Sequence, residues 1–194
     1  GPLKDYWAIG NDDRETAYFL RMYLSCYRAA QYLMSRPDWD GKTLVVCGTS
    51  QGGQQTLVTA ALVPQVTAAL AIVPAGCDML GPEANRRGGW PQWYDQAHGK
   101  DQAKVHEASR YFDVVNFASR IKCPVLVGFG LIDQTCPAEG VMAAMNQVTS
   151  PKELIALPLA EHQEINHAHK AYMDRCYNAW LPALRQGKPA PLNK

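Results

Sequence analysis

The sequence predicts an α/β fold, in which a mostly parallel sheet has helices on both of its faces. Four short apolar runs have the character of strands, and segments of helical character lie between them. Each run is apolar at consecutive positions, which is typical of strands that are buried on both faces of a parallel sheet. Strands that alternate with helices favour parallel pairing, because each helix carries the chain back across the sheet.

The first predicted element is a helix that begins near Asp12 and runs to about Arg36. Asp12 is suited to cap the first turn, and Glu15 stands three residues later, as in a capping box. Apolar side chains then recur at near-helical spacing. Further helices are predicted at about 51–62, 137–148 and 165–185.

The strands are predicted at 44–47, 68–73, 125–129 and 154–157. We expect the Cys47 thiol to be buried, because it lies inside the first apolar run.

The whole chain, residues 1–194, is predicted to form one domain, because its length and its 47% of hydrophobic residues suit a single core. Residues 78–112 are polar, contain Trp and Gly, and show little periodicity, so we expect a cap-like insertion there. The tail at 186–194 contains Pro, Gly and Lys and is expected to be frayed.

Charge and cysteine usage exclude several classes of protein. The chain carries 19 Lys+Arg against 18 Asp+Glu, which argues against a nucleic-acid binder driven by phosphate contacts. The apolar runs are too short to cross a bilayer. Six cysteines form neither a C-x-x-C motif nor zinc-finger spacing with histidine. No signal peptide is visible, and the sequence leaves the compartment open, whether secreted, periplasmic or cytoplasmic.

The motif G-x-S-x-G occurs as Gly48-Thr49-Ser50-Gln51-Gly52, between a predicted strand and a predicted helix. In that context the motif forms a nucleophile elbow, a sharp turn that projects the serine hydroxyl from the carboxyl edge of the sheet. Glycines two residues before and after Ser50 leave room for the turn. The Gln51 N–H then points to where an oxyanion forms. The alternative is a plain glycine-rich turn.

Ser50 needs a base and an orienting acid to act as a nucleophile. Asp133 follows the third predicted strand and His162 follows the fourth, which agrees with the order serine, acid, histidine of α/β-hydrolases. Asp78, after the second strand, is a rival acid. The other candidates are His98 and His106, expected at the surface, His167 and His169, expected on a solvated helix face, and Glu161 as a second acid.

These motifs resemble carbohydrate esterase family 7, which contains acetyl xylan esterases and cephalosporin C deacetylases. The hexapeptide at 48–53 is similar to the family's G-x-S-Q-G-G elbow. Further similar segments lie at 111–118, 121–126, 130–133, 136–137 and 143–146, the last three around the family's acid. The likeness runs from about residue 11 to 165.

The resemblance implies that Ser50 is the nucleophile, Asp133 the orienting acid and His162 the base. It further implies deacetylation of small or oligosaccharide acetyl esters without a metal or organic cofactor, and ring-shaped homo-oligomers. Two departures stand out: Gln163 occupies the place of a Glu that usually follows the family's base, and an Arg-Gly-Gln motif before the elbow is absent.

The 43 residues before Leu44 hold one long helix and loops, whereas the resemblance implies four strands before the elbow strand. We therefore expect the chain to be the C-terminal part of an α/β-hydrolase fold, with the elbow strand exposed as an edge. A second oxyanion donor would then be missing, at a cost of about 10²–10³ in turnover, unless a missing N-terminal segment supplies it. The alternative is a short hydrolase in which residues 3–9 form a covering strand.

Two tryptophans of the insertion, Trp90 and Trp93, are candidates for binding substrate. They could form an aromatic surface that stacks on sugar rings or shapes an acyl pocket. In the alternative, they pin an irregular loop onto the sheet.

Together these features predict a serine esterase that acts on carbohydrate or related small esters, with no cofactor and with no nucleic-acid or membrane partner. The alternatives are a serine peptidase of the same fold, or a non-catalytic half whose site is completed by a partner segment.

Overall fold

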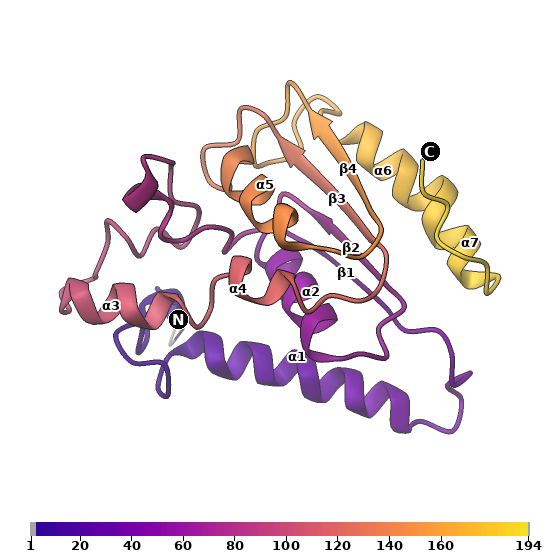
Figure 1. Cartoon of the computed structure of the whole chain (residues 1–194), viewed down its shortest axis with the longest axis horizontal. Helices are drawn as coiled ribbons and strands as arrows, with labels where there is room; N and C mark the ends of the chain where they lie inside the picture. Colours follow the sequence, from indigo (N-terminus) through magenta and orange to yellow (C-terminus); the bar gives the residue numbers. More distant parts are fainter. Residues whose placement is uncertain (1–2, 194) are drawn as a thin grey trace.

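A computed structural model describes residues 3–193 and contains one sheet of four strands (Figure 1). The strands are β1 (Val45–Thr49), β2 (Ala68–Ile72), β3 (Val125–Gly130) and β4 (Lys152–Leu157). They pair in parallel in the order β1-β2-β3-β4. The prediction of a parallel sheet is confirmed, and all four strands lie within two residues of their predicted ends.

Helices cover both faces of the sheet (Figure 1). One face carries α1 (Tyr18–Ser35), α2 (Gln51–Leu62), α4 (Val115–Ala118) and α5 (Ala138–Gln147), and the other carries α6 (Lys170–Arg175) and α7 (Leu181–Arg185). The core is divided accordingly. Ala69 and Ala71 of β2 face the first layer, whereas Leu70 and Ile72 face the second. All five side chains of β2 are buried, which explains why its sequence is apolar without alternation.

The first helix begins at Tyr18, so the predicted start near Asp12 is wrong. Asp13 instead closes a turn: its carboxylate accepts a hydrogen bond from Glu15 N, and its carbonyl accepts one from Ala17 N. Such a local side-chain bond competes with helix formation.

The last helical segment begins at Lys170, five residues after its predicted start. It contains a π-helical turn over Cys176–Trp180 between α6 and α7.

β1 lies at one edge of the sheet among the described residues. Residues 3–9 form a short 3₁₀ helix, Tyr6–Ala8, and no strand, so the covering strand considered above is not found. Cys47 is exposed, which contradicts the expected burial. An apolar run specifies burial only if another layer or strand covers it, and nothing in residues 3–193 pairs with the outer side of β1.

The segment 78–112 contains a 3₁₀ turn at Gly81–Ala84 and the helix α3 (Gln102–Ser109). It lies beside the start of the chain (Figure 1): Trp93 Nε1 donates a hydrogen bond to Trp7 O, and Lys100 Nζ donates one to Ala8 O. Residues 186–193 form neither helix nor strand. No helix in the described part of the chain is both long and apolar enough to cross a bilayer.

Candidate active site

Ser50 stands between β1 and α2 with φ 56° and ψ −119°, a conformation that L-residues rarely adopt. A Cβ added to Gly48 would lie 2.3 Å from the carbonyl oxygen of Gly52, so the turn requires glycine at position 48. A Cβ added to Gly52 meets no atom within 4 Å. The expectation that both glycines make room for the turn is therefore right for Gly48 and wrong for Gly52.

The structure brings Ser50, His162 and Asp133 together at the carboxyl end of the sheet. The Ser50 Oγ lies 2.7 Å from His162 Nε2, and His162 Nδ1 lies 2.9 Å from Asp133 Oδ2. The three residues follow β1, β4 and β3 in turn, so parallel strands deliver them to the same edge.

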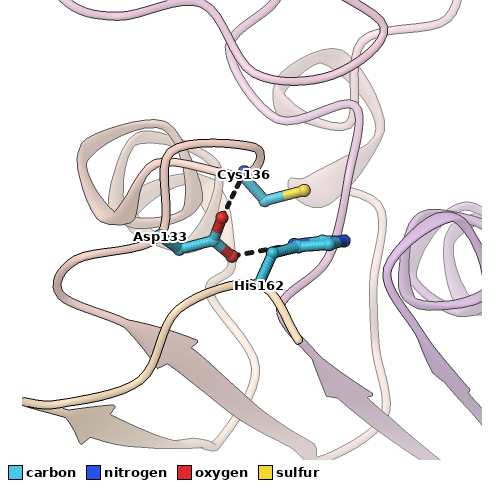
Figure 2. A group of neighbouring side chains, drawn as sticks. All are labelled: Asp133, Cys136 and His162. Atoms are coloured by element: carbon cyan, nitrogen blue, oxygen red, sulfur yellow. Dashed lines mark hydrogen bonds and ion pairs between the residues drawn. The ribbon is translucent and has the colours of Figure 1, made fainter. Parts of the chain in front are cut away.

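Hydrogen bonds around Asp133 orient its carboxylate toward the His162 ring. Its side chain is buried, and Oδ1 accepts the N–H groups of Thr135 and Cys136 at 2.8 Å each. Figure 2 shows the bond from Cys136. Oδ2 is left to accept from His162 Nδ1. With its proton on Nδ1, the neutral imidazole presents a free Nε2 lone pair to the Ser50 hydroxyl, which is the tautomer that a general base needs.

Cys136 adds a third potential metal ligand beside Asp133 and His162 (Figure 2). Their ligand atoms lie within 4.8 Å of one another, and this is the one such group among the described residues. Burial, and then the neighbouring Asp133, raise the pKa of the Cys136 thiol. A thiol that resists deprotonation is a poor metal ligand, and the carboxylate already holds the imidazole, so the group suits proton transfer better than metal binding.

The first oxyanion candidate, the Gln51 N–H, lies at the first position of α2. Such an N–H has no carbonyl one turn earlier in the helix to bond, and it lies at the positive end of the helix dipole. The Gln51 side chain is tied down separately: Oε1 accepts from Tyr6 Oη at 2.8 Å, and Nε2 lies 3.0 Å from Met22 Sδ.

Tyr6 was not among the residues expected at the site. Its contact with Gln51 joins positions 45 residues apart, and no local spacing signals such a contact. The only sign in the sequence is the aromatic pair Tyr6-Trp7, which packs with Tyr18 and Trp90 at ring distances of 5.3 to 6.1 Å.

Trp93 is 1% exposed and packs 4.9 Å from the Phe19 ring, so it cannot stack on a sugar. For Trp93 the structure contradicts the substrate-binding expectation and agrees with the alternative, in which the ring pins the insertion. Trp90 is half-buried and contacts Trp7 and Phe19.

The rival acid Asp78 and the rival histidines His98 and His106 lie outside the Ser50–His162–Asp133 group. Asp78 pairs with Arg86 at 2.6 Å. His98 is exposed, and His106 stacks on Tyr94 at 4.5 Å.

The other two rivals, His167 and His169, belong to the segment after His162. His167 is exposed, as expected. His169 is 2% exposed, so its predicted place on a solvated helix face is wrong. Its ring contacts the carbonyl of Glu161 and the carboxylate of Glu164.

Comparison with known proteins shows the family of the chain. A family model described as acetyl xylan esterase (AXE1) matches residues 3–179. The chain belongs to the acetyl xylan esterase family. The acetyl esterase Axe7A of Xylanibacter ruminicola is 42% identical over 173 residues, which are 88% of this chain and 39% of Axe7A.

Two solved acetyl xylan esterases have the same fold. The enzyme from Paenibacillus sp. R4 superposes with a TM-score of 0.74 at 29% identity, over 87% of this chain and 55% of that one. Acetyl xylan esterase 1 from Thermoanaerobacterium sp. JW/SL YS485 gives 0.72 at 28% identity, over 89% and 57%. The predicted family and the α/β-hydrolase fold class are confirmed. The chain spans between 39% and 57% of the length of these relatives.

Proposed function

We propose that the chain carries the catalytic centre of a serine esterase that removes acetyl groups from carbohydrates or related small esters. The main support is the continuous hydrogen-bonded path from Ser50 through His162 to Asp133, built on a strained elbow. Membership of the acetyl xylan esterase family supports the ester class. The choice of acetyl as the acyl group rests on the similarity to an acetyl esterase and to acetyl xylan esterases.

In the proposed reaction, Ser50 Oγ attacks the acyl carbon while His162 Nε2 takes the hydroxyl proton. Asp133 holds the imidazole through Nδ1 and stabilises its positive charge. The Gln51 N–H donates to the oxyanion of the tetrahedral intermediate. His162 then returns the proton to the leaving alcohol, which leaves an acyl group on Ser50.

A water molecule hydrolyses the acyl-enzyme in the second half of the reaction. His162 removes the proton of the attacking water, and the collapse of the second tetrahedral intermediate restores the Ser50 hydroxyl and releases acetate. Every step uses side chains and backbone groups of this chain, so the proposed mechanism needs no metal and no organic cofactor.

The most direct test is covalent labelling of Ser50 with a fluorophosphonate probe. We expect the wild type to be labelled and Ser50→Ala to stay unlabelled, and equal labelling of both would reject Ser50 as the nucleophile. Nitrophenyl acetate and acetylated xylo-oligosaccharides test the acyl class. Faster cleavage of peptide substrates than of acetyl esters would favour a serine peptidase instead.

We further propose that the chain associates with another polypeptide. This is either a further segment of the same protein, N-terminal to residues 1–194, or a second copy of the chain. The unpaired outer side of β1 supports this, as does the single oxyanion donor that we identify in the described residues. If activity appears only after the added segment binds, a catalytic half is favoured over a self-sufficient esterase.

A further inference from the structure

The base His162 lies on a segment without regular structure. Residues 158–169 connect β4 to α6 and contain neither helix nor strand. Asn166 and His167 within it have positive φ values of 52° and 59°. A base must keep its imidazole within hydrogen-bonding reach of the nucleophile, so such a segment needs anchors close to His162.

One anchor lies two residues before the base. A Cβ on Gly130, at the end of β3, would lie 2.3 Å from the carbonyl oxygen of Ala160. The segment therefore passes directly over the end of β3, and its backbone is fixed there by close contact with the sheet.

The second anchor is a buried histidine that the proposed mechanism does not use. His169 Nε2 lies 3.1 Å from the carbonyl oxygen of Glu161, the residue immediately before the base. His169 Nδ1 lies 3.1 Å from Glu164 Oε2, and the same carboxylate oxygen accepts the backbone N–H of His169 at 2.8 Å. The Glu161 carbonyl is an acceptor, so Nε2 carries the N–H that donates in this contact.

His169 is itself held firmly to the sheet. It stands at the N-terminal boundary of α6, three residues before the buried Tyr172. A Cβ on Gly128 would lie 2.7 Å from the Tyr172 ring, so α6 packs directly on β3. The contact between His169 and Glu161 therefore ties the backbone next to His162 to a helix that the core fixes.

We infer that the His169–Glu164 pair positions the base His162 for proton transfer with Ser50. His169 acts through the Glu161 carbonyl and touches neither Ser50 nor the imidazole of His162, so it is a positioning residue. The inference rests on the proposed function, in which His162 is the base. It assigns a role to a histidine and a glutamate that lie outside the Ser50–His162–Asp133 path.

The test compares four variants with the wild type. His169→Ala removes both ring contacts, and Glu164→Ala removes the carboxylate. Glu164→Gln keeps an oxygen that can accept the backbone N–H of His169, so it serves as the conservative rescue. His167→Asn is the matched control, because His167 is exposed on the same segment and asparagine tolerates its positive φ.

Two readouts are measured on folded protein: the kcat and KM for nitrophenyl acetate, and the downfield proton resonance of the His162 Nδ1–H bond to Asp133. We expect His169→Ala to lower kcat by about 10- to 100-fold with KM within about threefold, since a small displacement of a catalytic group has that effect. The resonance should broaden or vanish in the same variant. Glu164→Gln and His167→Asn should stay within about threefold of the wild type.

An unchanged resonance and an unchanged kcat in His169→Ala would overturn the inference. The inference is also overturned if Glu164→Gln and Glu164→Ala lower kcat equally and change KM by the same factor. That result would mean that Glu164 and His169 support the fold in general and do not position His162. If the wild type hydrolyses no ester, the proposed function fails, and the resonance still decides whether His169 positions His162.

Discussion

Ser50 has an unfavourable backbone conformation, and its contacts explain how the chain retains it. A residue in a sparsely populated region of φ and ψ costs about 1–3 kcal/mol. Ser50 N donates to Ile72 O at 3.0 Å, and Ser50 O accepts from Ala75 N at 3.0 Å. Both partners belong to the end of β2 or the loop after it, so the sheet itself holds the hydroxyl in place.

The glycine before Ser50 provides a sharp test of this turn. Gly48→Ala places a Cβ 2.3 Å from backbone atoms of Gly52, so we expect a loss of at least about 1–3 kcal/mol in the free energy of unfolding. Gly52→Ala is the control, since its Cβ meets nothing and alanine favours a helix by about 1 kcal/mol. Urea unfolding of both variants measures the difference, and equal losses would contradict the steric explanation.

Asp133 is expected to act through the tautomer of His162. Asp133→Asn keeps the size of the side chain but can offer an N–H toward His162 Nδ1, which favours the imidazole with its proton on the wrong nitrogen. We expect kcat to fall by about 10⁴-fold with the fold retained. Steady-state kinetics with nitrophenyl acetate and circular dichroism check this, with the exposed Asp38→Asn as control. A loss of less than tenfold would argue against the proposed role.

Asp113 is a buried carboxyl whose pKa is raised to about 6, because desolvation outweighs the N–H groups of Val115, Met79 and Asp78 that bond it. A carboxyl with a raised pKa favours the folded state when protonated. Its contribution to stability is therefore fully present below about pH 4 and is lost as the pH rises through about 6.

Asp113→Asn removes this titration. We expect its free energy of unfolding to vary less than that of the wild type between pH 4 and 7. Urea unfolding across that range measures both proteins. Parallel pH profiles would show that Asp113 titrates alike in the folded and unfolded states.

Among the elements, β4 is joined to the C-terminal helices and the tail by one carboxylate. Glu153 is 8% exposed and accepts hydrogen bonds from Arg175 at 2.6 and 2.9 Å and from Trp180 Nε1 at 3.3 Å. Asn193 donates to the same carboxylate through its backbone and its side chain. The composition of the tail at 186–193 predicts fraying, yet Asn193 in this tail is hydrogen-bonded to β4.

Glu153→Ala should destabilise the protein by about 3–5 kcal/mol, because it leaves the guanidinium of Arg175, 19% exposed, without its partner. Asp38→Ala is the matched control, since it breaks an ion pair with Arg36 that lies in solvent. Thermal unfolding monitored by calorimetry compares the two variants. A midpoint for Glu153→Ala equal to that of the control would mean that the network contributes nothing.

The elements differ in how much of them the sequence predicts. Strands and the elbow are predictable, because an apolar run or a glycine pattern is local information that burial enforces. The start of α1 is not, because the Asp13 side chain builds a competing turn. The positions of Cys47, Trp93 and His169 depend on which distant segments cover them, and no spacing along the chain records that.

At the scale of the whole molecule, β1 forms one edge of the sheet in the described part of the chain, and none of its five residues is fully buried. A groove of about 330 Å³ runs beside it between α1 and α2. It is lined by Cys26, Ala29, Ala30, Leu33, Leu44, Val45, Val46, Cys47, Gly52, Gln55, Thr56 and Thr59. An edge strand with apolar surroundings is a template for pairing with another strand.

We expect the purified chain to associate in a concentration-dependent way through this edge, as measured by sedimentation velocity. Cys47→Lys places a charge on β1 and should shift the distribution toward monomer, because lysine on an edge strand opposes pairing. Ser25→Lys adds the same charge on the exposed side of α1 and should leave association unchanged. A monodisperse wild-type monomer at all concentrations would contradict the expectation.

The two layers of helices reach the reacting groups from opposite sides: α2 follows Ser50 in one layer, and α6 supports the loop of His162 from the other. On the proposed mechanism, ester hydrolysis therefore depends on the alignment of the two helical layers across the sheet. We expect hydrostatic pressure or mild heating that displaces one layer to abolish hydrolysis before circular dichroism shows any loss of helix.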